Sequence, residues 1–226
     1  MIEMLAITES HDQGKPVALA RMIDIPRSAS NFRFFAETIR HQNHDRVNHI
    51  KKNGKDATSY THRIPVGVAG LISPWNLPMY LLTWKIAPAI AFGNTCVCKP
   101  AELTSMTAFE LCKIIKQSGL PNGVVNIIFG RGAVAGEAIV VHPDVPLVSF
   151  TGSTSVGARI MAQVAPMIKK TSMELGGKNP ALVFEDCDIN KAAAGCALSS
   201  FTNQGNMIVQ TLPCEFLSKI WQISSS

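Results

Sequence analysis

The chain has 226 residues, of which 46% are hydrophobic and 16% are charged, a composition that indicates a folded protein with a substantial core and excludes extensive disorder. The formal net charge is +5, but the lysines and arginines are scattered along the chain. The densest basic run, Lys51 to Lys55, is short and has no interleaved aromatic residues, which argues against a nucleic-acid partner.

The first forty residues have a helical pattern. Apolar residues recur at helical spacing, with a break at Gly14, and a second amphipathic stretch from Ala29 to Ile39 follows Pro26. The chain then turns polar from residue 41 to residue 62. Within this stretch Asn53-Gly54 is a turn pair between two extended arms, which predicts a β-hairpin.

Short apolar runs alternate with helical segments from Pro65 to Ala165. The expected strands are 66–72, 95–99, 124–128 and 147–151, and the expected helices are 77–91, 105–118, 133–141 and 156–165. This alternation is typical of βαβ units in a parallel sheet. The predicted fold is therefore α/β, with a doubly wound, Rossmann-like sheet. A second sheet is expected to follow, with strands at 173–175 and 181–184, and a helix is expected at 189–201.

The glycine-rich stretch F-T-G-S-T-S-V-G, residues 150–157, lies between a predicted strand and a predicted helix. Backbone N–H groups and the helix N-terminus at such a turn can face a pyrophosphate. The spacing alone is weak evidence, because turns between strands and helices also use glycine for steric reasons.

Three further motifs follow predicted strands. P-W-N at 74–76 presents Asn76 with little backbone freedom, so its amide can donate to a developing oxyanion; the alternative is a rigid turn around a core tryptophan. K-P-A-E at 99–102 either faces solvent or brackets the hydroxyls of a ribose. E-L-G-G-K-N-P at 174–180 displays a glutamate at a strand end, where it can act as a general base.

These four motifs, which occur along the chain in the order P-W-N, K-P-A-E, F-T-G-S-x-x-x-G and E-L-G-G-K-N-P, resemble the aldehyde dehydrogenase superfamily. The stretches 9–16, 60–68, 121–126 and 199–205 are also similar to it, so the resemblance covers nearly the whole chain. Within the superfamily, residues 71–85 look most like the muconic semialdehyde dehydrogenases, the aminomuconic semialdehyde dehydrogenases in particular.

The resemblance implies NAD-dependent oxidation of an aldehyde to a carboxylate after a cysteine thiolate adds to the carbonyl. Asn76 would be the oxyanion donor, and Glu174 would activate water or the thiol. A carboxylate at Glu102 favours the free ribose hydroxyls of NAD, since it would repel a phosphate there. No metal is implied. The implied cofactor-binding residues are Ser73, Trp75, Lys99, Glu102, Gly152, Ser153, Val156, Gly157 and Leu175.

The resemblance also implies a division into segments and an assembly. Residues 1–40 would be the N-terminal helical part of the cofactor domain, and 41–64 a hairpin of the oligomerisation type. Residues 65–173 would form the NAD-binding domain, and 174–226 the incomplete start of a catalytic domain, with the chain truncated at both ends. A homo-oligomer is expected.

The cysteines and the N-terminus favour the cytosol. Six cysteines occur at irregular positions, and the close pair Cys96 and Cys98 alternates within a predicted strand rather than forming C-x-x-C. Buried free thiols in a reducing compartment are the plain interpretation. The sequence shows no signal-peptide pattern and no uninterrupted apolar run of about 18 residues, so no membrane association is expected.

One position departs from the family pattern F-x-N-x-G-Q-x-C. With Phe201, Asn203 and Gly205 in place, the cysteine falls on Ile208, which has no nucleophilic atom, and Cys214 lies six residues later. A deleted block between Gly205 and Met207 would explain this better than one exchange. Two functions stay open: part of an aldehyde dehydrogenase, or a catalytically inactive cofactor-binding or interaction protein. An unrelated Rossmann-type reductase is disfavoured, because G-x-G-x-x-G is absent.

Overall fold

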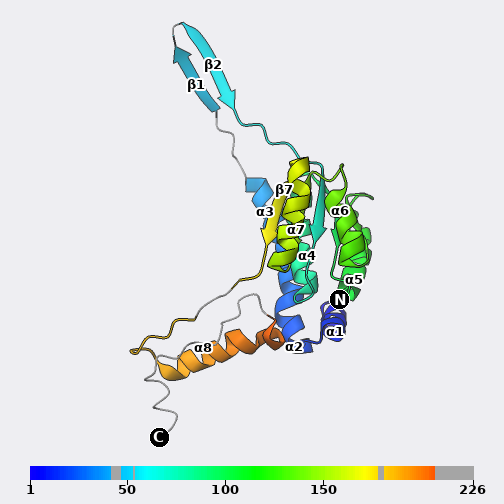
Figure 1. Cartoon of the computed structure of the whole chain (residues 1–226), viewed down its shortest axis with the longest axis vertical. Coiled ribbons are helices and arrows are strands. Elements are labelled where there is room, and N and C mark those ends of the chain that lie inside the picture. The colour runs from blue at the N-terminus through cyan, green and yellow to red at the C-terminus, as the bar shows by residue number, and fades with distance from the viewer. Residues whose placement is uncertain (42–46, 53, 178–180, 207–226) are drawn as a thin grey trace.

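Five parallel strands form the sheet at the centre of the molecule, seen in a computed structural model that describes residues 1–41, 47–52, 54–177 and 181–206 (Figure 1). The order across the sheet is β5-β4-β3-β6-β7. The chain thus starts in the middle, builds to one edge, then returns and builds to the other, which confirms the doubly wound arrangement. The strands are β3 (Val68–Ile72), β4 (Thr95–Lys99), β5 (Val125–Ile127), β6 (Leu147–Thr151) and β7 (Lys170–Glu174).

Helices cover both faces of this sheet because the central strands are apolar on both sides. Leu71 of β3 packs in one buried cluster with Leu82 of α4 and Leu111 of α5. The next residue, Ile72, points to the other face and packs with Ile139 of α6 and Ile160 of α7. The helices are α4 (Pro78–Ala91), α5 (Met106–Gln117), α6 (Glu137–Val141), which follows the π-helical turn η2 (Gly132–Gly136), and α7 (Thr154–Val164), which runs into the 3-10 turn η3 (Ala165–Met167).

The N-terminal segment is helical, as predicted, and packs on the α4 and α5 side of the body. Its first helix ends at Gly14, whose φ of 90° is a left-handed conformation that glycine adopts readily. The expected start of the second helix after Pro26 is wrong: α3 begins at Ile25, where it continues directly from the π-helical turn η1, and the Ile25 N–H donates to the Ala20 carbonyl. The elements are α1 (Ile2–Gln13), α2 (Val17–Leu19), the π-helical turn η1 (Ala20–Asp24) and α3 (Ile25–His41).

The predicted hairpin is present and projects from the body at one end (Figure 1). Strand β1 (Val47–Lys52) pairs antiparallel with β2 (Lys55–Tyr60). The turn joins Lys52 and Lys55, which face each other in the register. All side chains of β2 are exposed. An isolated two-stranded hairpin of this kind is only marginally stable in water.

The expected second sheet is not formed in the part of the chain that the structure describes. Residues 170–174 instead make β7, the fifth strand of the same sheet, in which Thr151 pairs with Glu174. Residues 181–184 form no strand. Helix α8 (Ile189–Phe201) begins after Asp188, whose Oδ1 accepts a hydrogen bond from the Lys191 N–H, and the 3-10 turn η4 (Thr202–Gly205) follows it.

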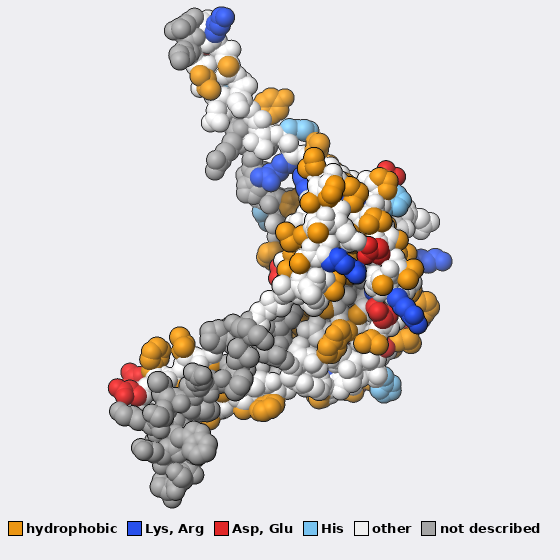
Figure 2. Space-filling view, in the orientation of Figure 1, with side chains coloured by type: hydrophobic (Ala, Val, Ile, Leu, Met, Phe, Trp, Pro, Cys, Tyr) orange, Lys and Arg blue, Asp and Glu red, His pale blue; other side chains and the backbone are white. Residues whose placement is uncertain are grey.

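The face of the molecule in Figure 2 shows no continuous basic surface. Lysine and arginine side chains lie scattered among hydrophobic and acidic ones. Within the described ranges, no helix is long and apolar enough to cross a membrane. In those same ranges, no group of three or more His, Cys, Asp or Glu side chains could hold a metal ion.

Candidate cofactor cleft

A cleft of about 340 Å³ opens at the carboxyl ends of β3, β6 and β7. Successive connections leave β3 and β6 toward opposite faces of the sheet, so their loops diverge and leave a crevice between them. Six of the predicted site residues line this crevice. The lining residues are Pro74, Trp75, Asn76, Thr151, Gly152, Ser153, Glu174, Leu175, Gly176, Gly177 and Asn206.

The loop after β3 presents Asn76 to the cleft. Trp75 is 43% exposed and lines the cleft, so the alternative of a turn built around a core tryptophan is wrong. The Asn76 side chain is buried, and its Nδ2 donates a hydrogen bond to the Asn206 carbonyl at 2.8 Å. Its backbone carbonyl accepts from Lys15 Nζ at 3.3 Å and from Asn203 Nδ2 at 2.8 Å. The amide is therefore fixed at both its backbone and its side chain.

The turn between β6 and α7 brings a helix N-terminus to the cleft. The Gly152 N–H donates to the Glu174 carbonyl at 3.1 Å, which ties the turn to the end of β7. Ser153 is the N-cap of α7, and its Oγ accepts from the Val156 N–H at 3.4 Å. The positive end of the helix dipole and the free N–H groups of this first turn favour an anion here.

Two glycines of this turn are required by close packing. A Cβ at Gly152 would lie 2.4 Å from the Phe150 ring, and one at Gly157 would lie 2.4 Å from Leu175 Cδ2. Side chains at these positions would push the turn away from the end of β7. The glycine-rich stretch therefore brings α7 and the wall of the cleft into direct contact, which the spacing alone did not establish.

Lys99 and Glu102 form an ion pair at the end of β4, beside the cleft and not in its lining. Lys99 is buried, and its Nζ donates to Glu102 Oε2 at 2.9 Å and to the Pro100 carbonyl at 3.1 Å. Glu102 is half exposed, and its Oε1 accepts from the Gly132 N–H at 3.4 Å. The hydrogen bond from Lys99 holds the pKa of the Glu102 carboxyl below its ordinary value. The alternative that both residues face solvent is therefore wrong for Lys99.

The remaining predicted residues lie at the same edge of the sheet. Ser73 is buried, and its Oγ finds no hydrogen-bond partner among residues 1–41, 47–52, 54–177 and 181–206. Val156 lies in the first turn of α7 and is partly exposed. Glu174 is exposed at the end of β7 and reaches the cleft. The predicted nucleophile position, Ile208, and Cys214 lie outside the described residues.

Lys85 is a buried cation next to the cleft that none of the sequence motifs indicated. Lys85 lies among the apolar residues of α4, and its Nζ donates to Ser149 Oγ at 2.8 Å. Burial lowers the pKa of Lys85 to about 8, an effect that the charge of Glu174 partly opposes. Lys85, Ser149 and Glu174 also line a second cavity of about 330 Å³, so Glu174 borders both cavities. The sequence feature that could have identified Lys85 is its position as a single lysine within an apolar helix.

The sequence that forms this cleft matches a known protein family. Residues 1–211 match the model of the aldehyde dehydrogenase family. The chain belongs to the aldehyde dehydrogenase family. This membership confirms the resemblance found in the four motifs, which all lie within the matched range.

Individual aldehyde dehydrogenases are similar over a part of their length. The 2-aminomuconic semialdehyde dehydrogenase of Homo sapiens is 55% identical over 212 residues, which is 93% of this chain and 42% of that protein. The 2-hydroxymuconic semialdehyde dehydrogenase of Pseudomonas sp. (strain CF600) is 44% identical, over 90% of this chain and 42% of that protein. An NAD+ complex of an aldehyde dehydrogenase from Bacillus cereus superposes with a TM-score of 0.86 at 42% identity, covering 90% of this chain and 41% of that one. This chain therefore spans about two-fifths of the length of these relatives.

Proposed function

We propose that this chain forms the cofactor-binding part of an NAD-dependent aldehyde dehydrogenase that oxidises a muconic semialdehyde to a carboxylate. The observation that carries the proposal is the convergence of Asn76, the Gly152 turn and Glu174 on one cleft, each from the end of a different strand. The similarity to two muconic semialdehyde dehydrogenases supports the choice of aldehyde. A cytosolic location is part of the proposal.

The residues present fit a dinucleotide. The N-terminus of α7 offers N–H groups for a pyrophosphate, and the glycines at 152 and 157 let the backbone approach closely. The buried Ser73 Oγ lacks a hydrogen-bond partner among the residues described. The ion pair of Lys99 and Glu102 would hold the hydroxyls of the adenosine ribose. A carboxylate at Glu102 repels a ribose phosphate, which supports NAD over NADP.

Asn76 and Glu174 would act on the reacting aldehyde. A bound NAD would accept the hydride from the aldehyde carbon. The Nδ2 group of Asn76, which now donates to a backbone carbonyl, would donate to the oxyanion that forms on the aldehyde oxygen. Glu174 would take the proton from water or from a thiol.

The covalent step needs a thiolate that Ile208 cannot supply. We therefore expect the chain to bind NAD without turning over an aldehyde. Calorimetric titration with NAD+ and a spectroscopic assay for aldehyde-dependent NADH formation test both points on the purified protein. A folded chain that does not bind NAD+ would overturn the cofactor role. NADH formation would contradict the expectation for Ile208.

We also propose that copies of this chain associate into a homo-oligomer through hairpin β1–β2. The exposed side chains of β2 and the projection of the hairpin from the body support this proposal (Figure 1). Sedimentation velocity tests it: a variant without residues 47–60 should form an assembly of fewer subunits than the whole chain. The same assembly in both would contradict it.

A further inference from the structure

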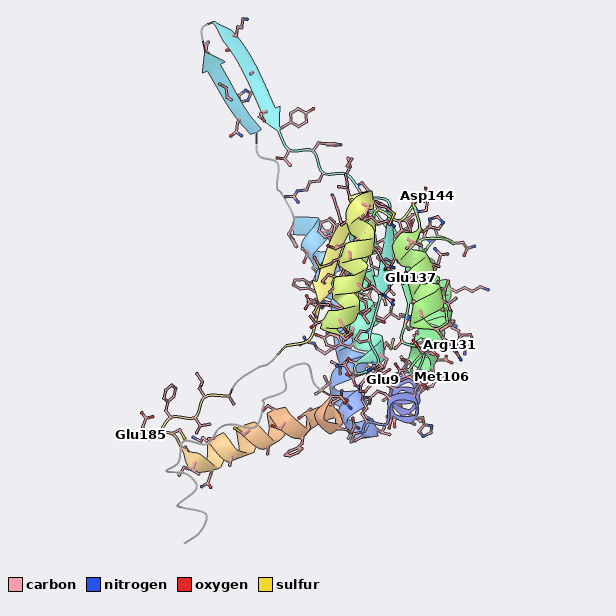
Figure 3. The ribbon with its side chains drawn as sticks, in the orientation of Figure 1. Glu9, Met106, Arg131, Glu137, Asp144 and Glu185 are labelled. Atoms are coloured by element: carbon pink, nitrogen blue, oxygen red, sulfur yellow. The ribbon has the colours of Figure 1, made fainter. Side chains whose placement is uncertain are left out.

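Three ionisable side chains from the N-terminal segment are buried beside the Asn76 loop. Glu9 lies on α1, Lys15 follows its end, and Asp24 ends the π-helical turn η1. None is more than 1% exposed. Figure 3 labels Glu9 at the end of the body where α1 meets α5, close to Met106. The three side chains are here called the N-terminal charge cluster. None of them is among the residues proposed to bind the cofactor.

The cluster is bonded to the loop at two points. Lys15 Nζ donates to Asp24 Oδ2 at 2.5 Å and to the Asn76 carbonyl at 3.3 Å. Glu9 Oε1 accepts from the Met79 N–H at 3.3 Å, at the start of α4. The segment from Asn76 to Met79 is therefore held at its first carbonyl and at its last N–H by the same cluster.

The cost of burying these charges indicates a specific role. A buried ion pair loses the hydration of both ions, and well-packed apolar side chains of similar volume are often as stable. A gain in stability alone therefore does not explain why the Lys15–Asp24 pair is buried. What an apolar pair would not provide is a donor aimed at the Asn76 carbonyl.

The position of that carbonyl fixes the direction of the Asn76 side chain. Lys15 approaches it from the N-terminal segment, and Asn203 Nδ2 approaches it from η4 at 2.8 Å. Two donors occupy both lone pairs of one carbonyl oxygen. The peptide plane after Asn76 cannot rotate without breaking both bonds, so the Cα–Cβ bond keeps its direction. With that direction fixed, Nδ2 reaches the Asn206 carbonyl at the cleft.

We propose that Lys15, paired with Asp24, is a positioning residue whose ammonium holds the Asn76 main chain so that the Asn76 amide stays directed into the cleft. The catalytic value of this positioning rests on the proposed function. The geometry itself can be tested without the cofactor.

The test uses two matched variants of the chain. Asp24→Asn removes the partner charge and keeps the ammonium, whereas Lys15→Met/Asp24→Asn removes both. The readout is the ¹⁵N–¹H resonance of the Asn76 side-chain amide, assigned by its loss in Asn76→Ser, with thermal melting as the control for folding. We expect the Asn76 resonance near its wild-type position in Asp24→Asn and clearly shifted in the double variant.

An unshifted Asn76 resonance in a folded double variant would overturn the proposal, because Lys15 would then only stabilise the fold. If the methionine variant does not fold, Lys15→Gln/Asp24→Asn replaces it. Glutamine fills similar space with a neutral donor that ends one bond short of the Nζ position, and the same shift is expected. Failure of the wild type to bind NAD+ would overturn the proposed function and leave this resonance test intact.

Discussion

Two glutamates of this chain have pKa values displaced in opposite directions, and their surroundings explain why. Burial raises the pKa of Glu9 from 4.5 to about 7, although Thr107, Lys15 and the Met79 N–H each oppose this and Asp24 adds to it. Glu102 is exposed to solvent and accepts from Lys99, which lowers its pKa. Desolvation dominates at the first residue and a charged hydrogen bond at the second.

The raised pKa of Glu9 predicts a pH dependence of stability. Folded Glu9 binds its proton up to about pH 7, whereas the unfolded residue releases it near pH 4.5. This contribution is complete below pH 4.5 and decreases as the pH rises to about 7, by about 3 kcal/mol in the free energy of unfolding. Glu9→Gln should flatten the curve between pH 4.5 and 7 in urea unfolding experiments. An unchanged slope would contradict the assignment.

Glu102 is predicted to set the preference between the two dinucleotides. In Glu102→Gln the repulsion of a ribose phosphate is removed, so the ratio of NADP+ to NAD+ affinity should rise about tenfold, the equivalent of about 1.4 kcal/mol. Calorimetry with both dinucleotides measures this ratio. Glu110→Gln is the matched control, because Glu110 also pairs with a lysine three residues away but lies within helix α5 and not at the end of strand β4. A ratio that changes equally in both variants would argue against the role of Glu102.

The sequence motifs predicted which residues would lie at the cleft, but no motif indicated the residues that hold the Asn76 loop in place. Asn76 and Glu174 stand in motifs at predicted strand ends, where parallel sheets keep ligands. Lys15 stands at a helix break between glycine and proline, where a lysine usually faces solvent. Its burial depends on Asp24 and Asn76, which only the tertiary structure brings to it.

Among the elements, strands were predicted well where both faces are covered. The predicted limits of β4 and β6 agree with the structure because each is an apolar run that ends at a polar turn. Strand β7 was misjudged because it forms an edge of the sheet and most of its side chains are exposed. Its sequence, K-T-S-M-E, has no apolar run, so its place in the sheet follows from pairing with β6.

The contact between β3 and α6 gives a prediction about packing. A Cβ at Gly70 would lie 2.4 Å from Ile139 Cγ2 and 3.0 Å from Val145 Cγ1, both in the buried cluster. Gly70→Ala should lower the free energy of unfolding by about 1–3 kcal/mol, measured by urea denaturation. The control is Gly195→Ala in α8, where a Cβ meets nothing within 4 Å. Equal stability of Gly70→Ala and the wild type would show that the sheet and helix can separate at no cost.

Over the whole molecule, the topology was predictable and the convergence of distant segments was not. Alternating strands and helices predicted the doubly wound sheet, and its reversal of direction predicted a crevice at the carboxyl ends of the strands. No local pattern indicated that Lys15 and Asn203, from opposite ends of the chain, would bond the same carbonyl. Such contacts depend on how α1 and η4 pack against the loop after β3.

The central claim is that the cleft at the ends of β3, β6 and β7 binds NAD, and calorimetric titration of two glycine variants with NAD+ tests it most directly. Gly157→Ala places a methyl group against Leu175 and displaces the α7 N-terminus, whereas Gly195→Ala leaves the cleft intact. We expect saturable binding to the wild type and to Gly195→Ala, and about tenfold weaker binding to a folded Gly157→Ala, the equivalent of about 1.4 kcal/mol. Equal affinity of all three proteins, or a folded wild type that does not bind NAD+, would contradict it.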